Sequence, residues 1–220
     1  MTKSVLEVKE EICEIGRRLY ALGFANSNDG NISVRLADDE IWVTPTGVSK
    51  GYMTPEMLVR VDLQGNVIEG DRNPSSETKM HLRVYQKRDD IQSVVHAHPL
   101  MSTAFAVCRK PLDKYYLTEA VAALGIVPVT EYATPSTEEV PDSIEPFLQD
   151  YTALLIANHG ALAWDETLIG AFYKMQQIEY LANIHLLVEQ IGNPVQIPDK
   201  EVERLMGLRQ FFKDYAKLGK

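Results

Sequence analysis

Helical and strand patterns follow one another along this 220-residue chain without a strict β–α–β order. A doubly wound parallel sheet needs that order, because a crossover joins each parallel strand to the next. Here short turns at Gln64-Gly65-Asn66 and at Asn158-His159-Gly160 separate pairs of strand-like segments, as in hairpins. We therefore predict an α/β chain whose antiparallel or mixed sheet is covered by helices.

The spacing of apolar residues predicts the individual elements. Helices are expected where apolar residues recur every three or four positions, and strands where short apolar or alternating runs end at turns. The predicted helices cover residues 4–22, 75–87, 100–107, 136–149, 166–191 and 199–217. Strands are predicted within residues 28–35, 40–43, 58–69, 91–99, 126–130 and 153–164. Ser75 or Ser76 is expected to cap the second of these helices.

Composition excludes several classes of protein. With 45% hydrophobic and 24% charged residues and no linker or repeat, residues 1–220 are expected to form one globular domain. The net charge of −9 argues against a nucleic-acid surface and against binding to anionic membranes. No apolar run is long enough for a signal peptide or a membrane span. Cys13 and Cys108 are expected to be buried thiols, and the protein to be cytoplasmic.

The histidines suggest a metal site. His96 and His98 lie two residues apart in a predicted strand, so their side chains point to the same face. A polar, solvated sheet edge is the simpler explanation of this pair. His159, beside Gly160 at a strand–turn junction, is a good third ligand, and three nitrogens suit a catalytic zinc site. Glu77, near the start of a predicted helix, is the best-placed carboxylate for a fourth ligand.

Two further histidines are given other roles. His81 lies four residues after Glu77 on the same helical face, where it could compete as a ligand. We interpret it instead as a core histidine or as one that supports the ligands. His185 lies among leucines in the middle of a predicted helix and is expected to pack.

Three turns of small residues precede the histidines, and each could hold a phosphate. They are Asp29–Ser33, Thr44–Gly47 and Pro74–Ser76. Glycine allows backbone N–H groups to approach an anion, hydroxyls add donors, and a helix start adds free N–H groups. Lys50 and Arg35 could assist but are expected to be ordinary surface charges.

Together these residues resemble the class II aldolase/adducin-head family over nearly the whole chain. The motifs are GNIS (30–33), TPTG (44–47), PSSE (74–77), HAH (96–98), YATP (132–135) and NHG (158–160). The resemblance implies a three-layer αβα fold with a mostly antiparallel central sheet, and a homotetramer with active sites between subunits. It implies that Zn²⁺, or alternatively Mn²⁺ or Co²⁺, is bound by Glu77, His96, His98 and His159. It also implies that a sugar phosphate is held by Gly30, Asn31, Thr46, Gly47, Ser75 and Ser76.

The activity implied by the resemblance is cleavage of a ketose 1-phosphate similar to L-fuculose 1-phosphate. The products would be dihydroxyacetone phosphate and a small aldehyde. Glu77 would act as the base, and its place in SSE rather than SSD favours an aldolase over a 4-epimerase. Tyr116 or Glu119 would act as the acid, across a subunit interface.

Other functions stay open at this point. A related dehydratase, decarboxylase or 4-epimerase would share the first half of the chemistry, and an adducin-head-like interaction module would share only the fold. The aromatic residues of the last predicted helix, Phe211, Phe212 and Tyr215, are expected to pack in the core or an interface. They could alternatively close over the active site of a neighbour.

Overall fold

A seven-stranded sheet forms the centre of the protein. The computed structural model describes residues 3–218, with side chains described for residues 3–208. The strands are β1 (Asn31–Ala37), β2 (Glu40–Val43), β3 (Val59–Val61), β4 (Val67–Glu69), β5 (Ser93–Ala97), β6 (Ala153–Ile156) and β7 (Gly160–Asp165). Their order is β4-β3-β2-β1-β5-β7-β6. Every neighbouring pair is antiparallel, which confirms the predicted type of sheet.

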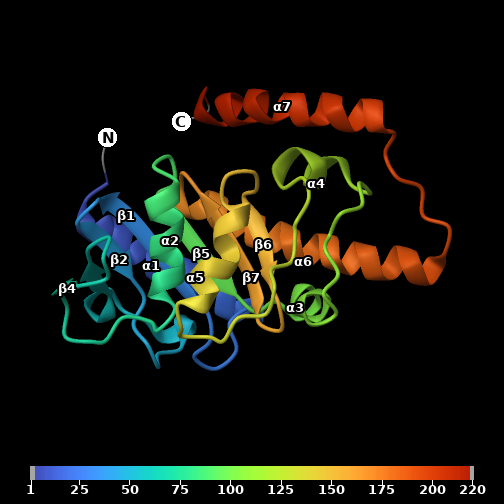
Figure 1. The fold of residues 1–220 in the computed structure, drawn as a ribbon. Helices are drawn as coiled ribbons and strands as arrows, with labels where there is room; N and C mark the ends of the chain where they lie inside the picture. Colours follow the sequence, from blue (N-terminus) through green and yellow to red (C-terminus); the bar gives the residue numbers. More distant parts are fainter. Residues whose placement is uncertain (1–2, 219–220) are drawn as a thin grey trace.

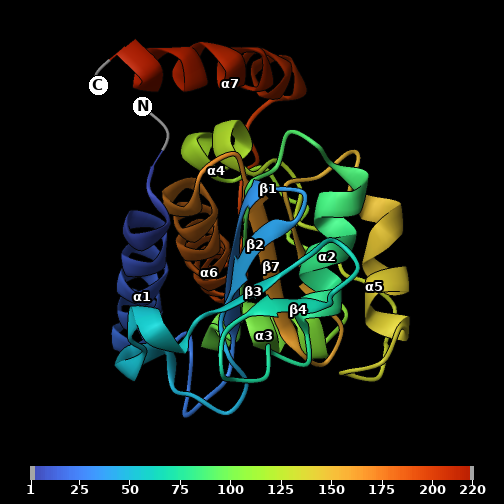
Figure 2. The same cartoon turned by 90° about the vertical axis from the view of Figure 1, so that its left-hand side faces the viewer.

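Helices cover both faces of this sheet, as the resemblance implied. They are α1 (Val5–Ala21), α2 (Thr78–Lys87), α3 (Leu100–Val107), α4 (Thr118–Ala123), α5 (Glu139–Ile144), α6 (Leu168–Ile191) and α7 (Asp199–Leu218). Helices α1 and α6 lie on one face and α2 and α5 on the other, giving three αβα layers (Figure 2). Helix α7 lies apart from these layers, above α4 (Figure 1).

The alternation of side chains along the strands divides the core in two. In β5, Val95 and Ala97 pack in the core on the α1 and α6 side, whereas Val94 packs in the core beside α2 and α5. Because successive side chains point to opposite faces, His96 lies on the same face as Val94. The face of β5 that carries His96 therefore looks toward α2, the helix that begins directly after Glu77.

Two predicted elements differ from the structure, and one helix was not predicted. No strand forms over 126–130: Val127 and Val129 make only isolated bridges, because Pro128 has no N–H to donate to a ladder. The helix predicted over 136–149 begins at Glu139, since Ser136 adopts a φ of 68°, and it gives way to a 3₁₀ turn at 145–147. Helix α4 is unpredicted, and Glu119 lies in its first turn.

Smaller predictions are also corrected. Neither Ser75 nor Ser76 is the N-cap of α2, because the helix begins one residue later and Glu77 takes that position. The hydroxyl of Ser75 instead accepts a hydrogen bond from the Glu77 N–H. Cys13 is buried, but Cys108 is exposed where α3 ends, so the expectation of two buried thiols is wrong for Cys108.

Two further observations concern the ends of the chain and membranes. The side chains of Phe211, Phe212 and Tyr215 lie outside the described residues, so their expected packing stays a prediction. Among the described residues, no helix is both long and apolar enough to cross a membrane.

Candidate metal centre and phosphate cleft

His96 is held rigidly at the end of β5. It is fully buried, and its Nδ1 lies 2.9 Å from the backbone oxygen of Ala161 on the neighbouring strand β7. A carbonyl oxygen only accepts, so Nδ1 must carry the proton of the neutral ring. The lone pair is then on Nε2, which faces the other histidines. A hydrogen bond of this kind fixes the tautomer and orientation of many metal-binding histidines.

A glycine brings the other two histidines together. His159 lies in the β6–β7 turn, after Asn158 in a left-handed conformation (φ 57°). A Cβ at the next residue, Gly160, would lie 2.5 Å from the Ala97 oxygen and 2.6 Å from the His98 ring. Only glycine allows the turn to approach the end of β5 this closely. His98 also lies near Asp29, with 3.6 Å between Nδ1 and Oδ2.

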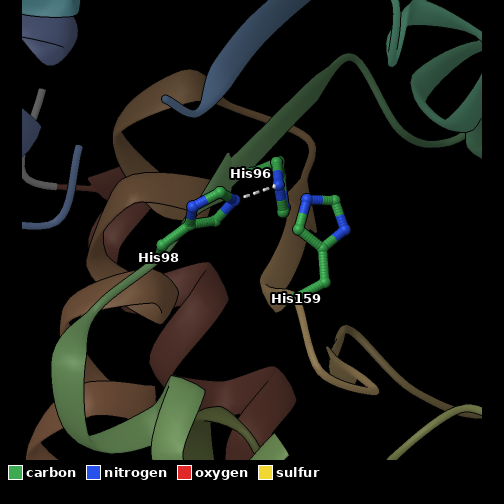
Figure 3. Close-up of side chains that lie close together, drawn as sticks. All are labelled: His96, His98 and His159. Carbon is green, nitrogen blue, oxygen red and sulfur yellow. Dashed lines mark hydrogen bonds between the residues drawn. The ribbon is translucent and has the colours of Figure 1, made fainter. Parts of the chain in front are cut away.

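The three imidazoles face one another, as Figure 3 shows. Their ring centres lie 4.7 to 4.9 Å apart, and their ligand atoms lie within 4.8 Å of one another. The Nε2 atoms of His96 and His98 are 2.9 Å apart. His96, His98 and His159 thus form a group that could hold a metal ion.

The carboxylate of Glu77 lies beside this group. One oxygen lies 3.0 Å from Nε2 of His159 and the other 3.4 Å from Nε2 of His96. Four tetrahedral ligands at the usual zinc distances lie roughly 3.3 Å from one another. Glu77 is therefore at ligand spacing from two of the three histidines, and nitrogen and carboxylate donors are types that suit a divalent cation.

The electrostatic environment also favours the protonation states in which these side chains can bind a metal. Burial lowers the pKa of His96 and His98, and neighbouring histidines lower both further, so the rings are neutral near pH 7. Burial opposes ionisation of Glu77, yet its polar contacts, among them hydrogen bonds from His159 and Asn31, hold its pKa well below the usual range. Neutral imidazoles and an ionised carboxylate are the protonation states that bind metal.

A cleft of about 240 Å³ opens beside these side chains. Glu77, His98 and His159 line it, whereas His96 lies behind them, fully buried. All the residues predicted to hold phosphate line the cleft as well: Gly30, Asn31, Thr46, Gly47, Ser75 and Ser76. The structure thus brings the predicted phosphate turns and metal ligands to one place.

Backbone hydrogen bonds join two of the turns. The N–H of Thr46 donates to Asn73, and the N–H of Ser75 donates to Thr44. Gly30 has a φ of 75°, and a Cβ there would lie 2.9 Å from the His96 oxygen. The first turn is therefore packed directly against the strand that carries His96.

Lys50 and Arg35 are not surface charges, so that expectation is wrong. Lys50 is 1% exposed, lines the cleft, and donates from Nζ to the backbone oxygens of Asn28 and Val48. Arg35 is 7% exposed, and its guanidinium donates to backbone oxygens at the end of α2. Both cations are buried because backbone oxygens replace the water they lose.

Sequence reasoning missed Lys50 as a residue of the cleft. Its position three residues after Gly47 and between Ser49 and Gly51 was a usable signal, because this sequence continues a phosphate-type turn. Pro135 and Ser136 also line the cleft, and Pro135 ends the YATP motif, which had been given no role.

The two candidate acids lie elsewhere in the chain. Tyr116 and Glu119 are not among the residues that line the cleft. The Tyr116 ring packs against His185, with 5.1 Å between ring centres, and His185 is buried as expected. Glu119 is exposed and accepts a hydrogen bond from the Thr118 hydroxyl.

Comparison with known proteins identifies the family. Residues 10–186 match the model of the class II aldolase and adducin N-terminal domain. The chain belongs to this family. As a class II aldolase, it is a carbon–carbon lyase, and enzymes of this class depend on a metal ion.

The chain matches its relatives over nearly the full length of both proteins. A 5-deoxy-D-ribulose 1-phosphate aldolase from Bacillus thuringiensis is 33% identical, over 90% of this chain and 92% of the relative. A 3-oxo-tetronate 4-phosphate decarboxylase from Haemophilus influenzae is 31% identical, over 91% and 96% respectively. The solved structure of an L-fuculose 1-phosphate aldolase is 36% identical and superposes with a TM-score of 0.87, covering 96% of this chain and 100% of that one.

Proposed function

We propose that this class II aldolase cleaves a ketose 1-phosphate to dihydroxyacetone phosphate and a small aldehyde. The observation that carries the proposal is the single cleft lined by Glu77, two of the three clustered histidines and the three phosphate turns. Relatives that act on 5-deoxyribulose and fuculose 1-phosphates support the substrate class.

We propose His96, His98, His159 and Glu77 as the ligands of one divalent cation. Nitrogen and carboxylate donors suit Zn²⁺, and Mn²⁺ or Co²⁺ is also compatible with this set. When bound, such a cation supplies Lewis-acid polarisation of the substrate carbonyl and offsets the negative charge that develops on bond cleavage.

The side chains of the protein account for the phosphate and the proton. The proposed phosphate ligands Gly30, Asn31, Thr46, Gly47, Ser75 and Ser76 anchor one end of the substrate. Glu77 accepts the proton of the C4 hydroxyl as the C3–C4 bond breaks, and the electron pair of that bond remains on C3. An acid then protonates C3, which completes dihydroxyacetone phosphate, while C4 leaves as the aldehyde.

We propose that Tyr116 or Glu119 of a neighbouring subunit in a homotetramer is that acid. Neither residue lines the cleft of its own chain, and Glu119 is exposed on α4, where a second subunit can reach it. Mixing two inactive variants tests the arrangement. Hybrids of Glu77→Gln with a Tyr116→Phe/Glu119→Gln double variant should regain activity, and hybrids as inactive as their parents would contradict it.

The decisive experiment is a panel of ketose 1-phosphates with coupled detection of dihydroxyacetone phosphate. The metal-loaded wild type should release it from at least one of them, and Glu77→Gln should lose about 10²–10⁴-fold in kcat. Release of CO₂ from a 3-oxo acid phosphate instead would transfer the assignment to a decarboxylase, the chemistry named for the Haemophilus relative. No turnover and no bound metal would favour an interaction module.

A further inference from the structure

A polar seam runs beneath α2, away from the cleft. Asn31, Ser33 and Arg35 alternate along β1, so they share the face that looks toward α2. On α2, His81 and Tyr85 lie four residues apart and face the strand. Asn31, Ser33, His81 and Tyr85 are each at most 4% exposed, although all four are polar.

Hydrogen bonds link these side chains into one chain that ends at Glu77. The hydroxyls of Tyr85 and Ser33 lie 2.7 Å apart, and Ser33 Oγ lies 2.7 Å from Nδ1 of His81. Nε2 of His81 lies 2.6 Å from the amide oxygen of Asn31. The amide nitrogen of Asn31 donates to Glu77 Oε2 at 2.6 Å.

With a neutral His81, one arrangement of protons satisfies the four contacts that link these side chains to Glu77. The carboxylate of Glu77 accepts, so Asn31 must turn its NH₂ group toward Glu77 and its oxygen toward His81. That oxygen also accepts, so Nε2 of His81 must carry a proton. Burial lowers the pKa of His81 to about 4, so the ring is neutral near pH 7 and Nδ1 accepts from Ser33. Ser33 in turn accepts from Tyr85.

We infer that His81 is a positioning residue that locks the Asn31 amide and thereby holds the Glu77 carboxylate in place among the histidines. With Nε2–H in position, a flipped amide would set its NH₂ against a donor and its oxygen against the carboxylate. This inference rests on the proposed role of Glu77 as a metal ligand and base.

The seam also shows which partners the Asn31 side chain binds. Both polar atoms of its amide are engaged, one by His81 and one by Glu77. The amide nitrogen carries two N–H donors, of which Glu77 takes one. Asn31 can therefore hold Glu77 and still offer its second N–H to a substrate phosphate.

The test compares two substitutions of His81 and one packing control, using Co²⁺ binding followed by absorbance as the readout. His81→Leu removes the donor, whereas His81→Gln can return an N–H to the Asn31 oxygen. Val84→Ala on the same helix removes fully buried apolar volume and touches none of these polar contacts. We expect about 10–100-fold weaker Co²⁺ binding in His81→Leu. Binding should be largely restored in His81→Gln and wild-type-like in Val84→Ala.

Equal losses in His81→Leu and His81→Gln, or in His81→Leu and Val84→Ala, would show a packing effect and overturn the inference. So would unchanged Co²⁺ affinity in His81→Leu. A double-variant cycle adds a second criterion: Asn31→Ala should cost about as much as His81→Leu, and the double variant little more than either. Additive losses would contradict the locked pair. Co²⁺ binding needs no substrate, so failure here is distinguishable from failure of the proposed activity.

Discussion

Lys50 offers a sharp test of the way the phosphate turns are held. Its ammonium is buried and donates at 2.9 Å to Asn28 and at 2.6 Å to Val48, so it ties the first turn to the second. Burial lowers its pKa to about 8 from an ordinary 10.5, although Asp29 and Glu77 partly oppose the shift. Substitution with methionine removes the charge and keeps most of the apolar stem.

The pH dependence of stability follows from this shift. Between pH 8 and 10.5 the unfolded chain keeps a proton on Lys50 that the folded chain has released, so the free energy of unfolding rises with pH. A difference of 2.5 pKa units corresponds to about 3 kcal/mol in total, and about 2 kcal/mol of it falls between pH 7 and 9.5. Lys50→Met lacks this contribution.

The assay is urea unfolding of the wild type and Lys50→Met from pH 7 to 9.5. All other titrating groups are shared, so the difference between the two proteins isolates Lys50. We expect the wild type to gain about 2 kcal/mol relative to the variant across this range. Lys110→Met, at an exposed lysine, controls for the loss of one positive charge. A difference that is flat across the range would refute the reasoning that Lys50 is a desolvated cation.

Three further predictions concern the metal centre and its supports. Gly160→Ala should force the turn away from Ala97 and His98. It should lower the free energy of unfolding by about 1–3 kcal/mol and lower the metal content measured by mass spectrometry. Gly207→Ala, with open space at its Cβ, should lower neither the stability nor the metal content. Glu179→Ala removes the carboxylate that accepts from the first amides of α3, so it should cost about 1–3 kcal/mol in urea unfolding, and an unchanged midpoint would contradict that role. Chelation should lower the melting temperature and addition of Zn²⁺ should restore it. At a hundredfold excess over Kd, bound metal adds about 3 kcal/mol to the free energy of unfolding. A melting temperature that chelator does not change would argue against a bound metal.

Local patterns were enough to predict most of the fold. Residues 40–43 and 100–107 have the bounds that their apolar spacing indicated. The strand expected at 126–130 failed because a single proline removed a ladder donor, a loss that hydrophobicity does not register. Helix α4 escaped notice because six residues are too few to display a helical period.

The candidate site, too, could be predicted only in part from the sequence. The cluster of three histidines could be predicted because His96 and His98 lie two residues apart where β5 ends and His159 lies at a turn with glycine. The burial of Lys50 and Arg35 could not, because Asn28, which accepts from Lys50, and the end of α2, which accepts from Arg35, are distant in sequence. The seam of Asn31, His81 and Glu77 likewise depends on the placement of α2 over β1. Only the tertiary fold places the polar face of α2 against the polar residues of β1.

The central claim is that one divalent cation, held by Glu77 and the three histidines, is required for cleavage of a ketose 1-phosphate. Titration of metal-free enzyme with Zn²⁺, with bound metal and dihydroxyacetone phosphate release measured on the same samples, tests it most directly. We predict that the rate rises in proportion to bound metal and levels off at one ion per chain. Full turnover by the metal-free enzyme, or a rate independent of bound metal, would contradict the claim.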